Sequence, residues 1–342
     1  MVRLDSKIEL SAETFDFCTE TSVTSSYDNL LDSAQVIIAK KIKYQNDQGK
    51  TIENITRGAN ALFKIGDTAS ISVGYNSLIT KIFTGFISGV KTKFPLKFSL
   101  EDEVYQLKQN SFNLSLKNPQ LSTLLKKIIP AGVEYEITAE QNLGNFRING
   151  GSTAMILDEL RKKHGIYSFF RDSVLYVGLA IVPKLQNTYR FEFNTVQIIS
   201  GDNLEYVDKD ERKIKVVCKS IDNANNTLEA TAGDADGETR TLYFNNITLK
   251  DLQATADRLK DELRYSGYNG NFETFASPAV NHGDIIELIN KEIPEQSGGY
   301  LCSKVVSNFG YAIGGRQYIY LKQKIYDLVE INGAFKVQNI GD

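Results

Sequence analysis

Three acidic residues in a glycine-rich stretch are the clearest candidates for binding chemistry in this sequence. Asp234, Asp236 and Glu238 alternate along the chain and are interleaved with Gly233 and Gly237. Carboxylate oxygens are the ligands that hard cations such as calcium prefer. The spacing does not fit the EF-hand loop, and acidic turns are common, so a solvated turn is the simpler interpretation of this segment.

Two further motifs could carry chemistry, and each has a structural interpretation. Residues 150–153 (Gly-Gly-Ser-Thr) precede a predicted helix and could cradle an anion, but the lysine of a phosphate loop is absent. His164 lies at the end of that helix, where a cationic imidazole favours the negative end of the dipole. His282 lies in a predicted turn, which it is expected to stabilise. Since no hydrolase, metalloprotease or nucleotide-binding motif is present, we predict no enzymatic activity and no cofactor.

The composition favours a β-rich protein of more than one packed unit. The chain has 342 residues, of which 42% are hydrophobic, and it contains 18 Phe and 17 Tyr but no Trp. A formal net charge of −3 gives no overall electrostatic reason to bind nucleic acid or anionic lipid. Cys18, Cys218 and Cys302 are far apart, which argues against disulfides and a zinc site. We expect synthesis in a reducing cytoplasm, without a signal peptide.

The candidate residues must be positioned by strands and helices of the fold. The clearest strand pattern in the sequence runs from residue 66 to residue 100. It begins with a Gly66-Asp67 turn, continues with an alternating strand over 69–75, and passes through an apolar strand that contains Gly85. A third strand alternates over 96–100. Period-2 alternation is typical of half-buried antiparallel strands, so this segment is predicted to be a meander in a sandwich or barrel.

A similar segment occurs near the C-terminus. Gly283-Asp284 precedes an apolar strand, and a polar loop that ends at Gly299 leads into two further strands. Gly-Asp before a strand is ordinary turn chemistry, so two occurrences could arise by chance. The same order of turn, strand and glycine-containing strand favours duplication.

The chain between the two meanders differs in composition. Asn118-Pro119 is predicted to start one helix, and a second helix is predicted from Thr153 to a left-handed Gly165. A strand hairpin over 167–177 follows. Further on, Thr248 and Asp251 form a capping pair at the start of a longer helix that Gly267 is predicted to end.

Together, Gly66-Asp67, the Phe83 to Val90 strand, the helix from Thr153 and the 169–178 hairpin resemble the phage late control protein D family. These proteins are baseplate hubs of contractile phage tails and are related to the hub part of type VI secretion spike proteins. The resemblance extends over residues 5–325 and carries no catalytic residue.

The resemblance implies a mainly β (α+β) fold. Two tandem tail-tube-like antiparallel β-barrel domains would flank a small α/β domain. The implied units are a first barrel over 1–105, an α/β unit over 106–188, a second barrel with one helix over 189–325, and a C-terminal strand pair or tail over 326–342.

The implied function is structural. Three chains would form a homotrimeric ring with pseudo-six-fold symmetry that joins a hexameric tail tube to a trimeric spike, which is a separate protein here. Further implied partners are the tape measure protein and other baseplate proteins. The chain would be made in the host cytoplasm and assembled into the virion tail baseplate or an equivalent injection apparatus, with no membrane binding of its own.

A carbohydrate-binding or carbohydrate-cleaving tail protein is the alternative, because antiparallel barrels with exposed tyrosines and acidic loops also bind sugars. Paired carboxylates on facing strands, beside an aromatic platform, would favour it. The absence of Trp counts against it.

Overall fold

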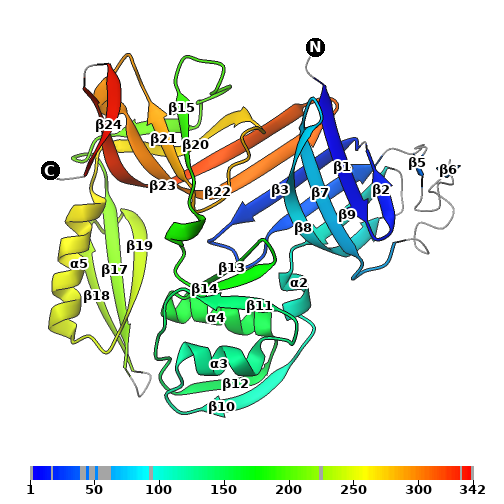
Figure 1. Cartoon of the computed structure of the whole chain (residues 1–342). Coiled ribbons are helices and arrows are strands. Elements are labelled where there is room, and N and C mark those ends of the chain that lie inside the picture. The colour runs from blue at the N-terminus through cyan, green and yellow to red at the C-terminus, as the bar shows by residue number, and fades with distance from the viewer. Residues whose placement is uncertain are drawn as a thin grey trace.

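The computed structural model describes residues 3–339 apart from 17, 39–43, 46–50, 53–62, 92–94, 223–225 and 332. The fold is mainly β, with 53% of residues in strands and 15% in helices, which confirms the predicted class. One long sheet crosses the top of the molecule in Figure 1, and two smaller units lie below it. Within the described residues, no helix is long and apolar enough to cross a membrane.

The first half of the long sheet contains the predicted meander. Strands β7, β8 and β9 are successive antiparallel neighbours; β1 pairs with β7, and β4 and then β3 follow beyond β9. Inward side chains such as Ile71, Ile87 and Phe98 form one buried core. The bounds are β1 Leu4–Leu10, β2 Glu13–Phe15, β3 Glu20–Ser26, β4 Ser33–Ile38, β5 Tyr44–Gln45, β6 Thr51–Ile52, β7 Thr68–Tyr75, β8 Leu78–Lys91 and β9 Leu96–Glu101.

The second half is built around β21, β22 and β23. β15 pairs with β21, and β20 and then β16 follow beyond β23. Its core includes Phe272, Ile286 and Tyr300, all almost without exposed surface. The bounds are β15 Thr188–Glu192, β16 Leu204–Val207, β20 Gly267–Phe275, β21 Ile285–Ile289, β22 Gly298–Gly310, β23 Gly314–Ile331 and β24 Ala334–Asn339.

The two halves share one strand order. In the first half the order across the sheet is β1-β7-β8-β9-β4-β3, and in the second half it is β15-β21-β22-β23-β20-β16. When only these six strands of each half are numbered in chain order, both sheet orders are first, fourth, fifth, sixth, third, second. One difference is the outer pair, which is antiparallel for β1 with β7 and parallel for β15 with β21.

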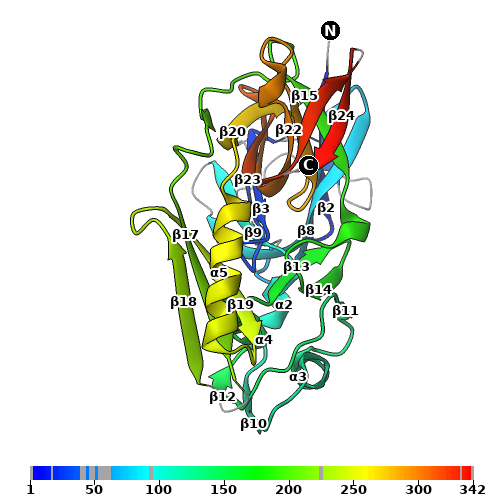
Figure 2. The same cartoon turned by 90° about the vertical axis from the view of Figure 1, so that its left-hand side faces the viewer.

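The halves join where β3, the outermost strand of the first half, pairs with the part of β22 that lies beyond its pairing with β21. The β3–β22 pairing is antiparallel over seven residues. Ser26 Oγ also donates to the carbonyl of Ser303 at 3.1 Å, and Tyr75 Oη donates to the carbonyl of Gly315 at 2.8 Å. The sheet is curved (Figure 2), but the pairings among the described strands leave it open and do not close it into two barrels. The finding is therefore a continuous antiparallel-rich sheet.

The first inserted unit lies beneath the junction (Figure 1) and has its own core around Leu124, Leu157 and Leu175. The predicted helix start at Asn118-Pro119 is wrong: Asn118 has a positive φ of 46°, and Gln120 is the N-cap. Gly165 ends the next helix at φ 64°, as predicted. The bounds are α2 Val104–Leu107, β10 Phe112–Leu116, α3 Leu121–Ile128, β11 Glu134–Ile137, β12 Phe146–Gly151, α4 Thr153–His164, β13 Tyr167–Arg171, β14 Val174–Gly178 and η1 Pro183–Leu185.

A second inserted unit interrupts the second half between β16 and β20. Its sheet of β18-β17-β19 is separate from the long sheet, and helix α5 covers it with Leu252 and Ala256 fully buried. The capping pair is confirmed, since Thr248 Oγ1 accepts from Asp251 N at 3.3 Å, but the helix ends at Leu263, before Gly267. The bounds are β17 Ile214–Ile221, β18 Thr227–Gly233, β19 Glu238–Asn245 and α5 Leu249–Leu263.

The C-terminal strands form a hairpin. β23 runs without a break to Ile331 and pairs with β24 beyond Tyr326. The predicted boundary between residues 325 and 326 therefore falls inside one strand.

Candidate assembly site

The first Gly-Asp turn connects to the middle strand of its meander through paired backbone hydrogen bonds. Gly66 has φ 95°, which favours glycine, and its N–H donates to the carbonyl of Ile87 at 2.8 Å. The Ile87 N–H returns a bond to the carbonyl of Asp67 at 2.8 Å. Within the turn, Asp67 N donates to the Lys64 carbonyl, and Lys64 N donates to Asp67 Oδ2 at 2.9 Å.

The second Gly-Asp turn repeats all four bonds. Gly283 has φ 85°, and its N–H donates to the carbonyl of Cys302 at 2.7 Å, while Cys302 N donates to the carbonyl of Asp284 at 2.9 Å. Asp284 N donates to the Asn281 carbonyl, and Asn281 N donates to Asp284 Oδ2 at 2.8 Å. The two predicted turns are therefore the same local motif, each connected to the fifth strand of its half.

The other two predicted repeat residues are also close-packing positions. A Cβ on Gly85 would lie 2.0 Å from the carbonyl oxygen of Glu101, and a Cβ on Gly299 would lie 2.2 Å from the ring of Tyr326. Both glycines lie in the long central strand of their half and permit a close approach of the sixth strand.

The first inserted unit is attached to both halves at the junction. Arg171 donates to the carbonyl of His282 at 3.1 Å, and Ser173 Oγ donates to Glu103 Oε1 at 3.1 Å. His282 is buried, and Phe169 meets it edge to face at 4.9 Å. Burial, followed by the nearby Arg171 charge, lowers the pKa of His282 to about 3. The histidine is therefore a neutral packing residue of its turn.

His164 also differs from the cationic cap that the sequence predicts. The side chain is buried, and burial followed by the charge of Lys163 lowers its pKa. A neutral imidazole at this position leaves the preceding Arg161, Lys162 and Lys163 to complement the helix dipole.

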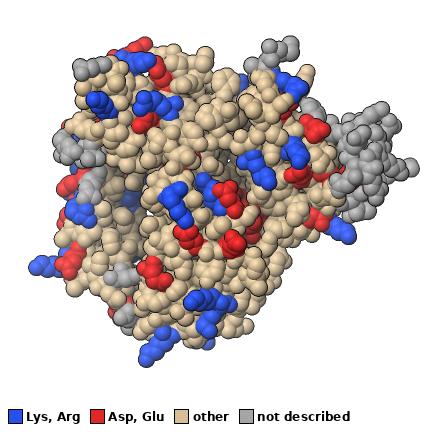
Figure 3. Space-filling model, in the orientation of Figure 1, with Lys and Arg blue, Asp and Glu red and all other residues tan. Residues whose placement is uncertain are grey.

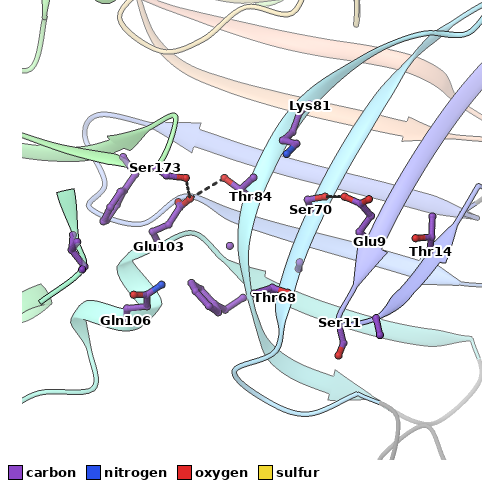
Figure 4. Close-up of a pocket in the computed structure, with 17 residues that line it drawn as sticks. Glu9, Ser11, Thr14, Thr68, Ser70, Lys81, Thr84, Glu103, Gln106 and Ser173 are labelled. Atoms are coloured by element: carbon purple, nitrogen blue, oxygen red, sulfur yellow. Dashed lines mark hydrogen bonds between the residues drawn. The ribbon is translucent and has the colours of Figure 1, made fainter. Parts of the chain in front are cut away.

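A cavity of about 540 Å³ lies between the outer face of the first half and the first inserted unit (Figure 4). Six of the residues that line it carry hydroxyl groups, and two glutamates reach into it. Glu103 accepts from Thr84 and Ser173, whereas Glu9 accepts from Ser70 at the other end of the cavity. The lining residues labelled in the figure are Glu9, Ser11, Thr14, Thr68, Ser70, Lys81, Thr84, Glu103, Gln106 and Ser173.

This cavity bears on the carbohydrate alternative, because it combines two carboxylates with the ring of Phe86. A general acid needs a pKa that is raised toward the working pH. The pKa of Glu9 is instead lowered, first by its hydrogen bond from Lys7 and then by that from Ser70. Glu9 is therefore unsuited to protonate a leaving group.

Asp32 and Asp102 line a cavity at the junction, and the pKa of each carboxyl group is raised. Asp32 N donates to Asp102 Oδ2 at 3.2 Å, and Asp102 N donates to the carbonyl of Asp32 at 3.0 Å. Loss of hydration raises the pKa of Asp32 to about 6; burial and then the Asp32 charge raise that of Asp102. Their oxygens also accept from Ser25, Ser26 and Val104, so the pair stabilises turns.

We expect Asp32→Asn to make the protein more stable at neutral pH but not in acid. Oδ1 still accepts from Ser26 N, and the new amide donates to Ser25 Oγ. Because the folded pKa is raised above its ordinary 3.8, folded Asp32 retains its proton longer, and stability falls as pH rises from about 4 to about 6. The gain should grow from near zero at pH 4 to roughly 1–2 kcal/mol at pH 8.

Urea unfolding between pH 4 and pH 8 measures this difference. Asp210→Asn, at an exposed position, is the charge-matched control and should change little across the range. A pH-independent difference for Asp32→Asn, or a loss of stability at pH 8, would contradict the proposed cause.

The three acidic candidates do not converge on a common point. Asp234 pairs with Arg264, Asp236 with Lys213 at 2.6 Å, and Glu238 with Arg240 at 2.8 Å. Each carboxylate thus has its own cationic partner. Among the described residues, no group of three or more metal-ligating side chains is placed to hold an ion.

The face shown in Figure 3 carries charged side chains of both signs. Basic and acidic side chains are interspersed on it. On this face the distribution agrees with the near-balanced composition and offers no broad basic surface for a polyanion.

The fold of this chain is similar to the folds of solved phage tail and type VI secretion proteins. The predicted resemblance to the baseplate hub family is confirmed at the level of the fold. No family model matches the sequence, and no curated protein matches it.

Three solved structures illustrate the similarity. A tail protein from Neisseria meningitidis has 18% identity and a TM-score of 0.58, and the match covers 94% of this chain and 96% of that chain. The 43 kDa tail protein of prophage MuSo2 from Shewanella oneidensis has 12% identity and a TM-score of 0.60, with 94% and 97% covered.

The third structure is an Escherichia coli component of the type VI secretion system that is similar to bacteriophage T4 tail proteins. It has 9% identity and a TM-score of 0.53, with 99% of this chain and 80% of that chain covered. At these identities the similarity establishes the fold alone.

Proposed function

We propose that this chain is a structural baseplate hub of a contractile phage tail or related injection machine, located in the assembled tail. Three copies form a ring of six equivalent units, which joins a hexameric tail tube to a trimeric spike. The role is architectural and involves no catalysis.

The observation that carries this proposal is the repeat within the chain. Both halves have the same strand order, and both contain a Gly-Asp turn with the same four hydrogen bonds. A chain with two similar units can present three-fold symmetry to one partner and near six-fold symmetry to another. The proposal includes duplication of a barrel. In the assembly, the open sheet would be completed either by closing on itself or by strands of a neighbouring chain.

The edges of the sheet support assembly into a ring. In the first half β1 pairs with β7 and the short β2, and in the second half β16 pairs only with β20 among the described strands. A strand edge with unpaired backbone groups is a template for pairing with another chain. These edges are the proposed sites of contact between copies.

We expect a trimer in solution, with a mass of three times the 38.2 kDa chain. Sedimentation at micromolar concentration, with and without a cognate spike protein, measures the mass, and electron-microscopic class averages should show six lobes. Monomers alone under both conditions would overturn the ring.

The carbohydrate alternative has a different outcome in the same experiments. Saturable binding on a glycan array by a chain that stays monomeric would favour it. Trimer formation without glycan binding supports the hub.

A further inference from the structure

A cleft of about 440 Å³ separates the two inserted units beside the C-terminal end of α4. Apolar groups from both units line it, including Leu143, Phe146, Ile221 and the ring of Tyr243. Tyr243 also connects the units, because its hydroxyl donates to the carbonyl of Lys162. The volume lies within the range of sites that bind small ligands or single side chains.

Basic side chains line both walls of this cleft. Arg147, Lys162 and Lys163 come from the first inserted unit and Lys219 from the second, and Glu159 is the acidic residue among those that line it. The chain as a whole carries a formal net charge of −3, so this local excess of positive charge differs from the rest of the molecule.

The ion pairs in and around the cleft leave these cations able to bind a ligand. The lysines contact Asp158, Glu159 and Glu229 through side chains that are themselves substantially exposed. Such exposed pairs are weak and can exchange partners. Arg147 is exposed and forms no ion pair within the part of the chain that the structure describes.

A buried histidine provides an independent indication of a ligand. His164 lines the cleft with only 7% of its surface exposed, and its Nδ1 has no hydrogen-bond partner among the described residues. A buried polar nitrogen without a partner is costly, and an oxygen of a ligand would remove that cost. Phe146 lies beside the imidazole, with ring centroids 6.4 Å apart.

We propose that this cleft binds an acidic segment of a neighbouring protein, with an apolar side chain on the floor and carboxylates on the basic walls. Arg147 is suited to a bidentate contact with a carboxylate, and Lys219 provides a second charge from the opposite unit. The inference rests on the proposed function in one respect, namely that the neighbour is another protein of the same assembly. Binding would bridge the two inserted units.

Fluorescence anisotropy with the full-length chain tests the proposal. The probe is a labelled hexapeptide of Asp and Glu with one central Phe, and its control has Asn and Gln at the acidic positions. We expect saturable binding of the acidic peptide and at least tenfold weaker binding of the amide peptide.

Two double variants with the same change in net charge localise the binding. Arg147→Gln with Lys219→Gln should weaken the acidic peptide at least tenfold. Lys126→Gln with Lys127→Gln, on the exposed face of α3 outside the cleft, should change it less than twofold. Equal losses in both variants, or equal affinity for the two peptides, would reduce the effect to general charge attraction and overturn the proposal.

Sedimentation of the same samples separates this inference from the hub. If the chain forms an intact trimer but does not bind the peptide at millimolar concentration, the proposed binding at the cleft is rejected and the hub proposal is retained. If the chain binds the peptide but does not form a trimer, the proposed binding at the cleft is retained and the ring model is rejected.

Discussion

Asp284→Ala is expected to lower the free energy of unfolding by about 3 kcal/mol, because a fully buried carboxylate and the two backbone hydrogen bonds that it accepts are lost. Asp284 has no exposed surface, and its carboxylate accepts from Asn187 N at 2.9 Å and from Asn281 N at 2.8 Å. Alanine leaves both N–H groups without this acceptor in partly buried surroundings. Urea unfolding at pH 7 measures the loss.

Asp67→Ala is the matched control, since it removes the equivalent carboxylate from the equivalent turn. Asp67 is half-buried and accepts from Lys64 N, which water can hydrate after the substitution. We expect a loss of about 1 kcal/mol. Equal losses at the two positions would contradict the view that burial of the second turn sets the difference.

The greater cost at Asp284 has a structural reason beyond its turn. The bond from Asn187 holds the entry to β15, the strand by which the chain leaves the first inserted unit and joins the second half. β15 runs parallel to β21, and both strands begin at this carboxylate. Among the described residues, the Asp67 carboxylate accepts from Lys64 N within its own turn, whereas the Asp284 carboxylate also holds a second segment of the chain.

Local pattern was sufficient to predict the meanders. Alternation over 69–75 and 96–100 predicts β7 and β9, and the Gly66-Asp67 and Gly283-Asp284 pairs mark turns whose hydrogen bonds match. These features depend on neighbouring residues, so a sequence read in short windows contains them. The capping pair at Thr248 is predictable for the same reason.

Contacts between distant residues were not predictable in this way. The β3–β22 junction joins segments almost 300 residues apart, and nothing in either strand specifies that partner. The sequence prediction places the β17 segment in the second barrel, whereas β17 forms a separate sheet with β18 and β19. A strand rich in β-branched residues has the same local pattern in either sheet. Likewise, Asp32 and Asp102 are ordinary turn residues in the sequence, and only folding places them together.

The cleft beside His164 illustrates the same limit for a site. Basic residues in the last turn of a helix are explained by the helix dipole alone. Lys162 and Lys163 therefore do not indicate a binding site in the sequence. Their significance depends on Lys219, which the second inserted unit brings to the opposite wall.

Gly85→Ala is expected to destabilise the chain by about 3 kcal/mol or to prevent folding of the first half, because the added methyl meets main chain on the adjacent strand. The Cβ would lie 2.0 Å from the carbonyl oxygen of Glu101 and 2.7 Å from the Cα of Asp102. Backbone atoms in the centre of a sheet cannot move aside as a flexible side chain can. The displacement would also affect Asp102, whose carboxylate contacts the turn at Asp32.

Gly89→Ala, four residues along the same strand, separates this clash from a general effect of removing glycine. Its Cβ would lie 3.6 Å from the Cβ of Ser99, an ordinary contact, and alanine reduces the entropy of the unfolded chain. We expect a change within about 0.5 kcal/mol of zero or a small gain. Urea unfolding of both variants gives the comparison. Similar losses in the free energy of unfolding for the two variants would contradict the proposed clash. They would indicate that both glycines are needed for the flexibility of β8 and not for the close approach of β9.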